Sequence, residues 1–257
     1  MTELSAPTDL PAPAGPSATG PSATGPFATG PFATDPCATA DLSATGSAAA
    51  TGCSFLRDDP VIAVVRAPWI PDAAALCAAL AEGGINLTEF TCTTPNVTDH
   101  LLKASKAGWR VGLGTVLTAE QARRGVEAGA AFLVTPGCRP EVAEAAAAAG
   151  VPVVLGALTP TEVAHAVDLG AAAVKIFPAR AFGPGYFKDL RGPYPDVPLV
   201  ASGGVNAGNA AEFLAHGALA VCAGTDVVPP DVVAAGDWAE ITRRARAFTA
   251  ACAAAAS

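Results

Sequence analysis

Clustered cysteines and histidines are what this sequence most clearly lacks. Its seven cysteines follow no CxxC or CxH spacing, and its three histidines stand singly in alanine-rich stretches. Without such a cluster we expect no protein-built metal site. We also predict that the protein needs no cofactor. Scattered cysteines of this kind are typical of small apolar residues in a reducing compartment.

Positive charge and long apolar runs are also scarce. The chain has 15 lysines and arginines against 23 acidic residues, which gives a formal net charge of −8. An acidic chain without basic clusters argues against nucleic acid and anionic membranes as partners. No apolar run approaches the roughly 18 residues that a membrane-spanning helix needs, and the N-terminus lacks the pattern of a secretory signal. We therefore expect a cytoplasmic location.

The first 53 residues differ in composition from the rest of the chain. A five-residue unit is repeated there as GPSAT and GPFAT before it decays into DPCAT. Prolines at every fifth position among small residues bury too little apolar surface to offset the entropy of ordering. We predict a disordered tail over residues 1–53 and a single globular domain over residues 54–257.

From residue 61 onward, short apolar runs alternate with alanine-rich stretches of helical period. We expect strands at residues 61–65, 87–91, 110–113, 131–134, 151–155, 172–176, 198–201 and 218–223, and helices at 72–82, 96–107, 118–128, 139–149, 160–169, 186–190, 206–216 and 237–255. Eight such units predict an α/β fold, the (β/α)8 or TIM barrel. A doubly wound open sheet is the alternative, but no GxGxxG turn follows the first strand.

Lys175, one of only four lysines, lies inside an apolar strand-like run, Ala-Ala-Ala-Val-Lys-Ile-Phe. Burial disfavours the charged form of an amine, and an uncharged amine attacks ketones and aldehydes to give a Schiff base. The alternative is a structural lysine whose charge reaches a carboxylate or the solvent. Strand alternation directs Lys175 and Phe177 to the same side, into the barrel.

The second expected strand supplies a carboxylate. Alternation directs Glu89, Thr91 and Thr93 into the barrel and leaves apolar neighbours to contact the helices. Glu89 and Lys175 are therefore expected to share the barrel mouth, either as a structural ion pair or as a proton-transfer group beside a nucleophile. Because desolvation tends to cancel the attraction of buried charges, we favour the catalytic interpretation.

Polar and glycine-rich turns follow other expected strands. Thr115 follows the third expected strand and can offer a hydroxyl and an N–H to a carboxylate, although such a turn is also a common structural feature. Gly203 and Gly204 follow the seventh strand and Thr225 follows the eighth, where barrels of this kind often bind phosphate. Arg66, at the end of the first strand, could add a cation there, and tight structural turns are the alternative.

At these positions the sequence resembles the 2-keto-3-deoxy-6-phosphogluconate (KDPG) and 4-hydroxy-2-oxoglutarate (KHG) aldolase family, over nearly all of residues 56–235. The resemblance depends on the segments VIAVVR (61–66), GGI (83–85), EFT (89–91), GLGTVL (112–117), TPG (135–137), TPTE (159–162), KIFPA (175–179) and GGV (203–205). It implies a metal-free class I aldolase, usually a homotrimer. Such an enzyme converts a small 2-keto acid to pyruvate and an aldehyde in carbohydrate metabolism of the Entner–Doudoroff type.

The resemblance also implies roles for individual residues. Lys175 matches the Schiff-base lysine, and Glu89 matches the general acid and base. The positions matching substrate contacts are Thr93 and Thr115 at the pyruvate carboxylate, Phe177 beside the lysine, and Arg66, Gly203, Gly204 and Thr225 at the far, often phosphorylated, end.

Three positions depart from the family pattern. Thr93 stands where many members carry an arginine that holds the substrate carboxylate, Leu155 where a proline is usual, and Arg180 where an acidic residue is frequent. These departures leave the preferred substrate open. Two other functions also stay open: a phosphate-binding barrel isomerase or epimerase that uses Glu89 as its base, and a non-catalytic oligomeric scaffold.

Overall fold

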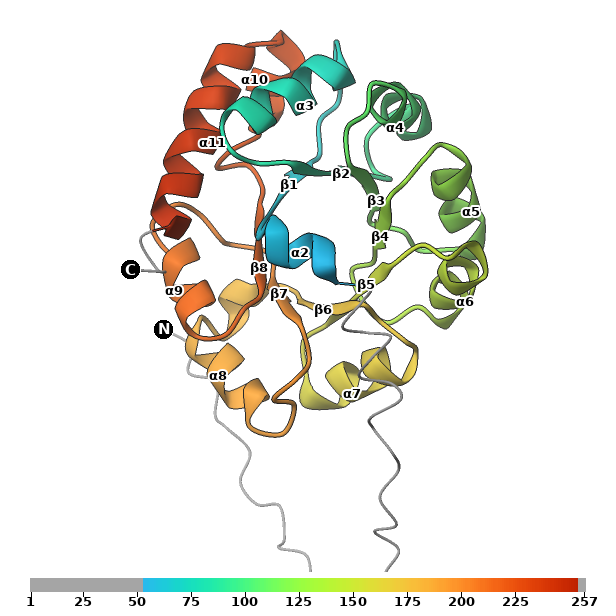
Figure 1. Ribbon diagram of the computed structural model, residues 1–257, viewed down its shortest axis with the longest axis vertical. Helices are drawn as coiled ribbons and strands as arrows, with labels where there is room; N and C mark the ends of the chain where they lie inside the picture. The colour runs from blue at the N-terminus through green and yellow to red at the C-terminus, as the bar shows by residue number, and fades with distance from the viewer. Residues whose placement is uncertain (1–52, 254–257) are drawn as a thin grey trace, which may run out of the picture. The chain divides into compact units, whose positions relative to one another are not determined.

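The structure, a computed structural model, describes residues 53–253. The tail predicted for residues 1–53 lies, apart from its last residue, outside the described residues. Eight parallel strands close into a barrel in chain order: β1 (Val61–Val65), β2 (Leu87–Thr91), β3 (Val111–Gly114), β4 (Phe132–Val134), β5 (Val153–Ala157), β6 (Ala173–Ile176), β7 (Leu199–Ala201) and β8 (Ala220–Ala223). Pairing of β1 with β8 completes the ring (Figure 1). The predicted TIM barrel is confirmed.

Helices follow the strands and surround the ring (Figure 1). They are α3 (Ala73–Glu82), α4 (Val97–Lys106), α5 (Ala119–Glu127), α6 (Pro140–Ala149), α7 (Pro160–Asp168), α8 (Gly185–Arg191), α9 (Ala210–Ala215) and α11 (Trp238–Ala253). Two further helices, α2 (Ser54–Asp58) and α10 (Pro230–Ala235), and the 3-10 turn η1 (Ala179–Ala181) were not expected. They are too short to show a periodic apolar pattern in sequence.

Helix α2 closes the N-terminal end of the barrel. It lies across the centre of the strand ring in Figure 1, directly before β1. Phe55 and Leu56 pack with the residues that fill the barrel interior, and the ring of Phe55 stacks on that of Phe132 with centroids 5.2 Å apart. Apolar side chains thus fill the barrel interior at this end.

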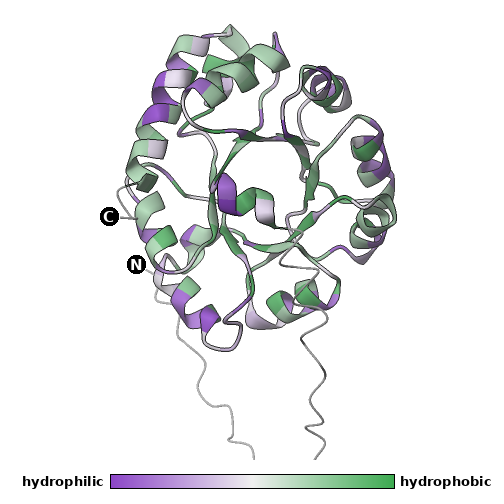
Figure 2. Ribbon diagram, viewed as in Figure 1, coloured by the Kyte–Doolittle hydropathy of each residue, from purple (hydrophilic) through white to green (hydrophobic). Residues whose placement is uncertain are grey.

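Apolar side chains form two layers. The inner cluster fills the barrel next to α2 with residues such as Ile62, Leu87 and Val154, and the outer cluster lies between strands and helices. Figure 2 shows the strands mostly in apolar colours, with hydrophilic residues concentrated on the helices. None of the helices formed by residues 53–253 is both long and apolar enough to cross a bilayer.

Helix starts after the strands are fixed by their own side chains. Thr159 accepts a hydrogen bond from the backbone N–H of Glu162, whose carboxylate accepts one from the backbone N–H of Thr159, and Pro160 takes the first helical position. Thr118 caps α5 by accepting a hydrogen bond from the backbone N–H of Gln121, whose side-chain oxygen accepts one from the backbone N–H of Leu117. These caps keep the loops at the C-terminal end of the barrel short.

Candidate active site

Lys175 and Glu89 meet inside the barrel. Lys175, on β6, and Glu89, on β2, both point inward, and Lys175 Nζ lies 3.9 Å from Glu89 Oε2. The Glu89 side chain is fully buried and that of Lys175 is 8% exposed. The juxtaposition inferred from strand alternation is therefore present, and of the two side chains only that of Lys175 is reached by solvent.

The Glu89 carboxylate is held by shape and not by hydrogen bonds. Neither of its oxygens has a hydrogen-bond partner among the described residues. Gly114, at the end of the neighbouring strand β3, lies so close that a Cβ there would overlap the carboxylate. A buried carboxylate without donors keeps both oxygens open to a hydrogen bond from a bound molecule.

Strand β5 pairs with β6 and supports the backbone of Lys175. It extends to Ala157, two residues beyond the expected end, so that Gly156 pairs in register with Lys175. The backbone N–H of Gly156 donates to the Thr135 hydroxyl, and a Cβ at Gly156 would overlap the backbone of Pro136 and Gly137. The tight packing fixes the backbone beside the amine.

Phe177 lies at the barrel mouth. Its side chain is 42% exposed, and Lys175 Nζ lies 5.6 Å from the centre of its ring. At this distance the ring face attracts the ammonium form and offers an apolar surface to a small ligand. The structure thus brings Phe177 to the lysine, as the resemblance implied.

Arg66 joins Thr93 and Thr115 into one polar cluster. Arg66 Nη1 donates to Thr93 Oγ1 at 2.6 Å, and Nη2 donates to Thr115 Oγ1 at 3.3 Å. Thr93 Oγ1 also lies 2.9 Å from the hydroxyl oxygen of the buried Thr91. The guanidinium is therefore turned toward β2 and β3, and among the described residues no side-chain hydrogen bond joins it to Gly203, Gly204 or Thr225.

Thr115 adopts an unusual backbone conformation. Its φ angle is +55°, in the left-handed region that β-branched residues seldom enter. Such a conformation costs about 1–3 kcal/mol and persists where neighbouring structure enforces it, often at ligand sites. Here it presents the Thr115 hydroxyl to Arg66, one residue after the glycine that contacts Glu89.

The loops after β7 and β8 form the other side of the mouth. Gly203 and Gly204 have φ angles of +88° and +87°, which explains glycine at both positions. The backbone N–H of Arg180 donates to the Gly203 carbonyl at 3.0 Å, and the Arg180 stem packs on Gly204. Thr225 is exposed on the loop after β8.

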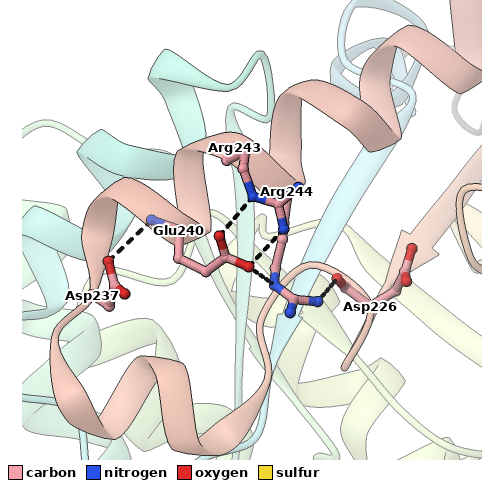
Figure 3. A network of polar contacts seen from close by, with 5 residues as sticks. All are labelled: Asp226, Asp237, Glu240, Arg243 and Arg244. Atoms are coloured by element: carbon pink, nitrogen blue, oxygen red, sulfur yellow. Dashed lines mark hydrogen bonds and ion pairs between the residues drawn. The ribbon is translucent and has the colours of Figure 1, made fainter.

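A polar network ties these loops to helix α11 (Figure 3). Asp226, next to Thr225, accepts a hydrogen bond from the backbone N–H of Ala207 at 2.9 Å and so links the two loops. Arg244 donates to the Asp226 carbonyl and to Glu240, which also pairs with Arg243. The hydrogen bond from Arg243 lowers the pKa of Glu240 to about 2.

Cys222 is a residue near the site that sequence reasoning missed. It lies inside the barrel on β8, and both Lys175 and Glu89 act electrostatically on its thiol. Burial raises the pKa of Cys222 to about 11, so the thiol stays protonated near Lys175 and Glu89. Strand alternation could have found it, since Cys222 shares a face of β8 with the inward Ala220.

Metal ligands do not gather at this mouth. Within residues 53–253, no three histidine, cysteine, aspartate or glutamate side chains come together as a possible metal site. The residues described above provide an amine, a carboxylate, hydroxyls and the guanidinium of Arg66.

Comparison with known proteins identifies relatives of this barrel. The family model described as KDPG and KHG aldolase matches residues 53–244. The 2-dehydro-3-deoxy-phosphogluconate aldolase of Treponema pallidum is 37% identical over 185 residues, covering 71% of this chain and 88% of that protein. The KHG/KDPG aldolase of Escherichia coli K12 is 32% identical over 196 residues, covering 75% of this chain and 92% of that protein.

A solved structure agrees with these matches. The KDPG aldolase of Legionella pneumophila, crystallised with pyruvate captured as a covalent carbinolamine intermediate, superposes with a TM-score of 0.69. It is 30% identical, and the match covers 79% of this chain and 97% of that one. Fold and relatives therefore lead to the same group of enzymes.

Proposed function

Because this chain belongs to the KDPG and KHG aldolase family, we propose that it cleaves a 2-keto-4-hydroxy acid to pyruvate and an aldehyde through a Schiff base on Lys175. The observation that supports this most directly is the pair formed by Lys175 Nζ and the buried, donor-free carboxylate of Glu89, 3.9 Å apart. A nucleophile and a proton carrier within reach of one small ketone are what the reaction requires.

The reaction begins at the amine of Lys175. Unprotonated Nζ adds to the C2 carbonyl, and loss of water leaves a protonated imine. Glu89 takes the proton of the C4 hydroxyl, the C3–C4 bond breaks, and its electron pair moves into the imine to give an enamine. The aldehyde departs. Glu89 returns its proton to C3 of the enamine, and water hydrolyses the resulting imine to pyruvate and the free lysine.

The remaining predicted residues shape the substrate site. We assign Phe177 to the apolar side of the bound ketone and Thr93 and Thr115 to its carboxylate. The far end of the substrate faces Gly203, Gly204 and Thr225. Substrates consistent with the family are 2-keto-3-deoxy-6-phosphogluconate, which yields glyceraldehyde 3-phosphate, and 4-hydroxy-2-oxoglutarate, which yields glyoxylate.

Several expectations accompany this proposal. A cytoplasmic location, a homotrimer, the absence of a cofactor and a tail preceding the barrel stay predictions. Light scattering of the purified full chain tests the homotrimer. Full activity after dialysis against a chelator tests the absence of a metal.

Trapping with borohydride tests the proposed chemistry. Incubation with pyruvate and sodium borohydride should reduce the imine to a stable adduct, which peptide mass spectrometry places on Lys175. Lys175→Met should abolish the adduct and the release of pyruvate from 2-keto-3-deoxy acids. Lys188→Met, on the outer helix α8, is the matched control and should keep both. An active enzyme that forms no adduct would instead support the isomerase or epimerase alternative.

A further inference from the structure

We propose that Arg244, on the last helix α11, is a positioning residue that holds the loop after β8 ready to receive the far end of the substrate. The proposal rests on the aldolase function proposed above, because it concerns the side of the mouth assigned to that end. Arg244 does not itself touch the substrate. It acts through the backbone of Asp226, the residue next to Thr225.

The contact between Arg244 and the loop is the first argument. Arg244 Nη1 donates to the backbone carbonyl oxygen of Asp226 at 3.1 Å (Figure 3). The carboxylate of the same Asp226 accepts a hydrogen bond from the backbone N–H of Ala207, on the loop after β7, at 2.9 Å. Asp226 is therefore held by its carbonyl to α11 and by its side chain to the neighbouring loop.

Helix α11 is a firm base for this contact. It packs on α3, where the Thr242 hydroxyl donates to the Ala79 carbonyl at 3.0 Å in a buried position. Gly83, at the end of α3, lies so close to α11 that a Cβ there would overlap Ala245. Because Ala245 directly follows Arg244, the backbone that carries the guanidinium is fixed against α3.

Glu240 orients the guanidinium of Arg244. Arg244 Nε donates to Glu240 Oε1 at 2.8 Å, one helical turn earlier, which leaves Nη1 for the loop. The Arg244 side chain is 32% exposed, against 65% for that of Arg243. Partial burial strengthens a charge-assisted hydrogen bond to a carbonyl. The direction of the Arg244 side chain is thus set by two contacts, one on its own helix and one on the loop.

The neighbouring Arg243 shows what Arg244 adds. Arg243 pairs with the same carboxylate through Nε at 2.6 Å and Nη2 at 2.7 Å, and no hydrogen bond among residues 53–253 joins its side chain to the loop after β7 or β8. Both arginines stabilise α11 as pairs one helical turn from Glu240. A purely structural role in the helix would therefore be shared by both, whereas a role in the loop would belong to Arg244.

The consequence for substrate binding follows from the position of Asp226 in the chain. Thr225 directly precedes it and is exposed on the loop assigned to the far end of the substrate. A loop that must be ordered when a ligand binds costs affinity, and a loop that is already held does not. Loss of Arg244 should therefore weaken the binding of an elongated substrate, while Lys175 and Glu89 keep their places on β6 and β2.

The test compares Arg244→Met with Arg243→Met in the full chain. Steady-state release of pyruvate from 2-keto-3-deoxy-6-phosphogluconate gives KM and kcat. For Arg244→Met we expect KM to rise about fivefold or more, as for one lost hydrogen bond, with kcat nearly unchanged. Half-maximal borohydride trapping on Lys175 should need the same pyruvate concentration as in wild type. Arg243→Met should match wild type in both assays, and Arg244→Lys, which keeps the charge, should recover part of the affinity.

Amide hydrogen exchange gives a measurement that does not depend on activity. The backbone N–H groups of Val227 and Val228 donate to the Gly224 carbonyl within the loop. Their exchange should be faster in Arg244→Met than in wild type or Arg243→Met. The proposal is overturned if Arg244→Met leaves KM unchanged, if both methionine variants raise it equally, or if exchange in the loop is unaffected. A wild-type chain that forms no pyruvate adduct would instead refute the Schiff-base function, and the exchange measurement would still decide whether Arg244 orders the loop.

Discussion

Gly114 and Glu89 lie in van der Waals contact across β3 and β2, and the carboxylate fills the space that a Cβ on Gly114 would need. The φ angle of Gly114 is not in the left-handed region, so the backbone itself would accept another residue. Glycine at this position is therefore explained by the side chain on the adjacent strand. Its role is to leave room for a buried carboxylate opposite the lysine.

Gly114→Ala should displace Glu89 while leaving Lys175 in place. We expect the rate of pyruvate release to fall about 100-fold or more, as when a general acid or base is misplaced. Borohydride trapping of pyruvate should continue, because the amine is retained. Gly185→Ala is the control, since a Cβ there meets open space. Equal loss in both variants would show that the effect is not specific to Glu89.

Glu89→Gln separates the packing role of the Glu89 side chain from its role in proton transfer. The amide has the size of the carboxylate but cannot carry the proton, so kcat should fall about 100-fold to 10,000-fold with little change in KM. Steady-state kinetics of pyruvate release measure both constants. If kcat were kept, Glu89 would be a structural partner of Lys175 and another group would move the proton.

Substitutions at Thr115 should affect the stability of the fold and the binding of pyruvate in different ways. At a φ of +55°, glycine is free of the strain that alanine would keep, so Thr115→Gly should be more stable than Thr115→Ala by about 1 kcal/mol. At an ordinary position the order is reversed. Urea denaturation compares the two variants. Both lack the hydroxyl that Arg66 contacts, so both should need more pyruvate for half-maximal trapping.

Strand periodicity in the sequence predicted that Lys175 and Glu89 point into the barrel. Because residues alternate across β2 and β6, the inward direction of Glu89 and Lys175 followed from counting, and the closed barrel confirmed that both face one interior. Strands β2 and β6 face each other across the interior only when all eight strands close into a barrel. The prediction that Glu89 and Lys175 meet therefore also needed the repeated alternation of strands and helices, which indicated eight strands.

Contacts made by loops could not be predicted in the same way. Arg66 stands one residue beyond β1, where no periodicity fixes the direction of a long side chain, and only its hydrogen bonds to Thr93 and Thr115 reveal it. Helix α2 has five residues, too few for an apolar period, although Phe55 and Leu56 close the barrel. The reason for glycine at position 114 likewise depends on a neighbouring strand.

Asp226 should position the loops that face the far end of the substrate. Asp226→Ala removes the acceptor for the Ala207 N–H, so the loop after β7 is less firmly held. We expect KM for a phosphorylated 2-keto-3-deoxy acid to rise about fivefold, the equivalent of one hydrogen bond. Pyruvate trapping should not change, since pyruvate has no far end. Asp226→Asn keeps an acceptor oxygen and should restore most of the affinity.

Cys222 should make stability depend on alkaline pH. Its folded pKa is about 11 against an ordinary value of 9.0, because burial disfavours the thiolate. Between these values the unfolded chain loses the proton and the folded chain keeps it, so the free energy of unfolding should fall as pH rises from 9 to 11. One thiol contributes at most about 1.4 kcal/mol per pH unit.

Urea denaturation in reducing buffer at pH 8, 9, 10 and 11 measures this contribution. Burial also raises the pKa of the Cys77 and Cys252 thiols to about 11, so the useful quantity is the difference between wild type and Cys222→Ala. That difference should be constant below pH 9 and should shift in favour of the variant as pH rises toward 11, because the variant has no thiol to ionise. A difference that stays constant up to pH 11 would mean that the Cys222 thiol ionises equally in both states, and that the barrel interior beside Lys175 is more polar than its packing indicates.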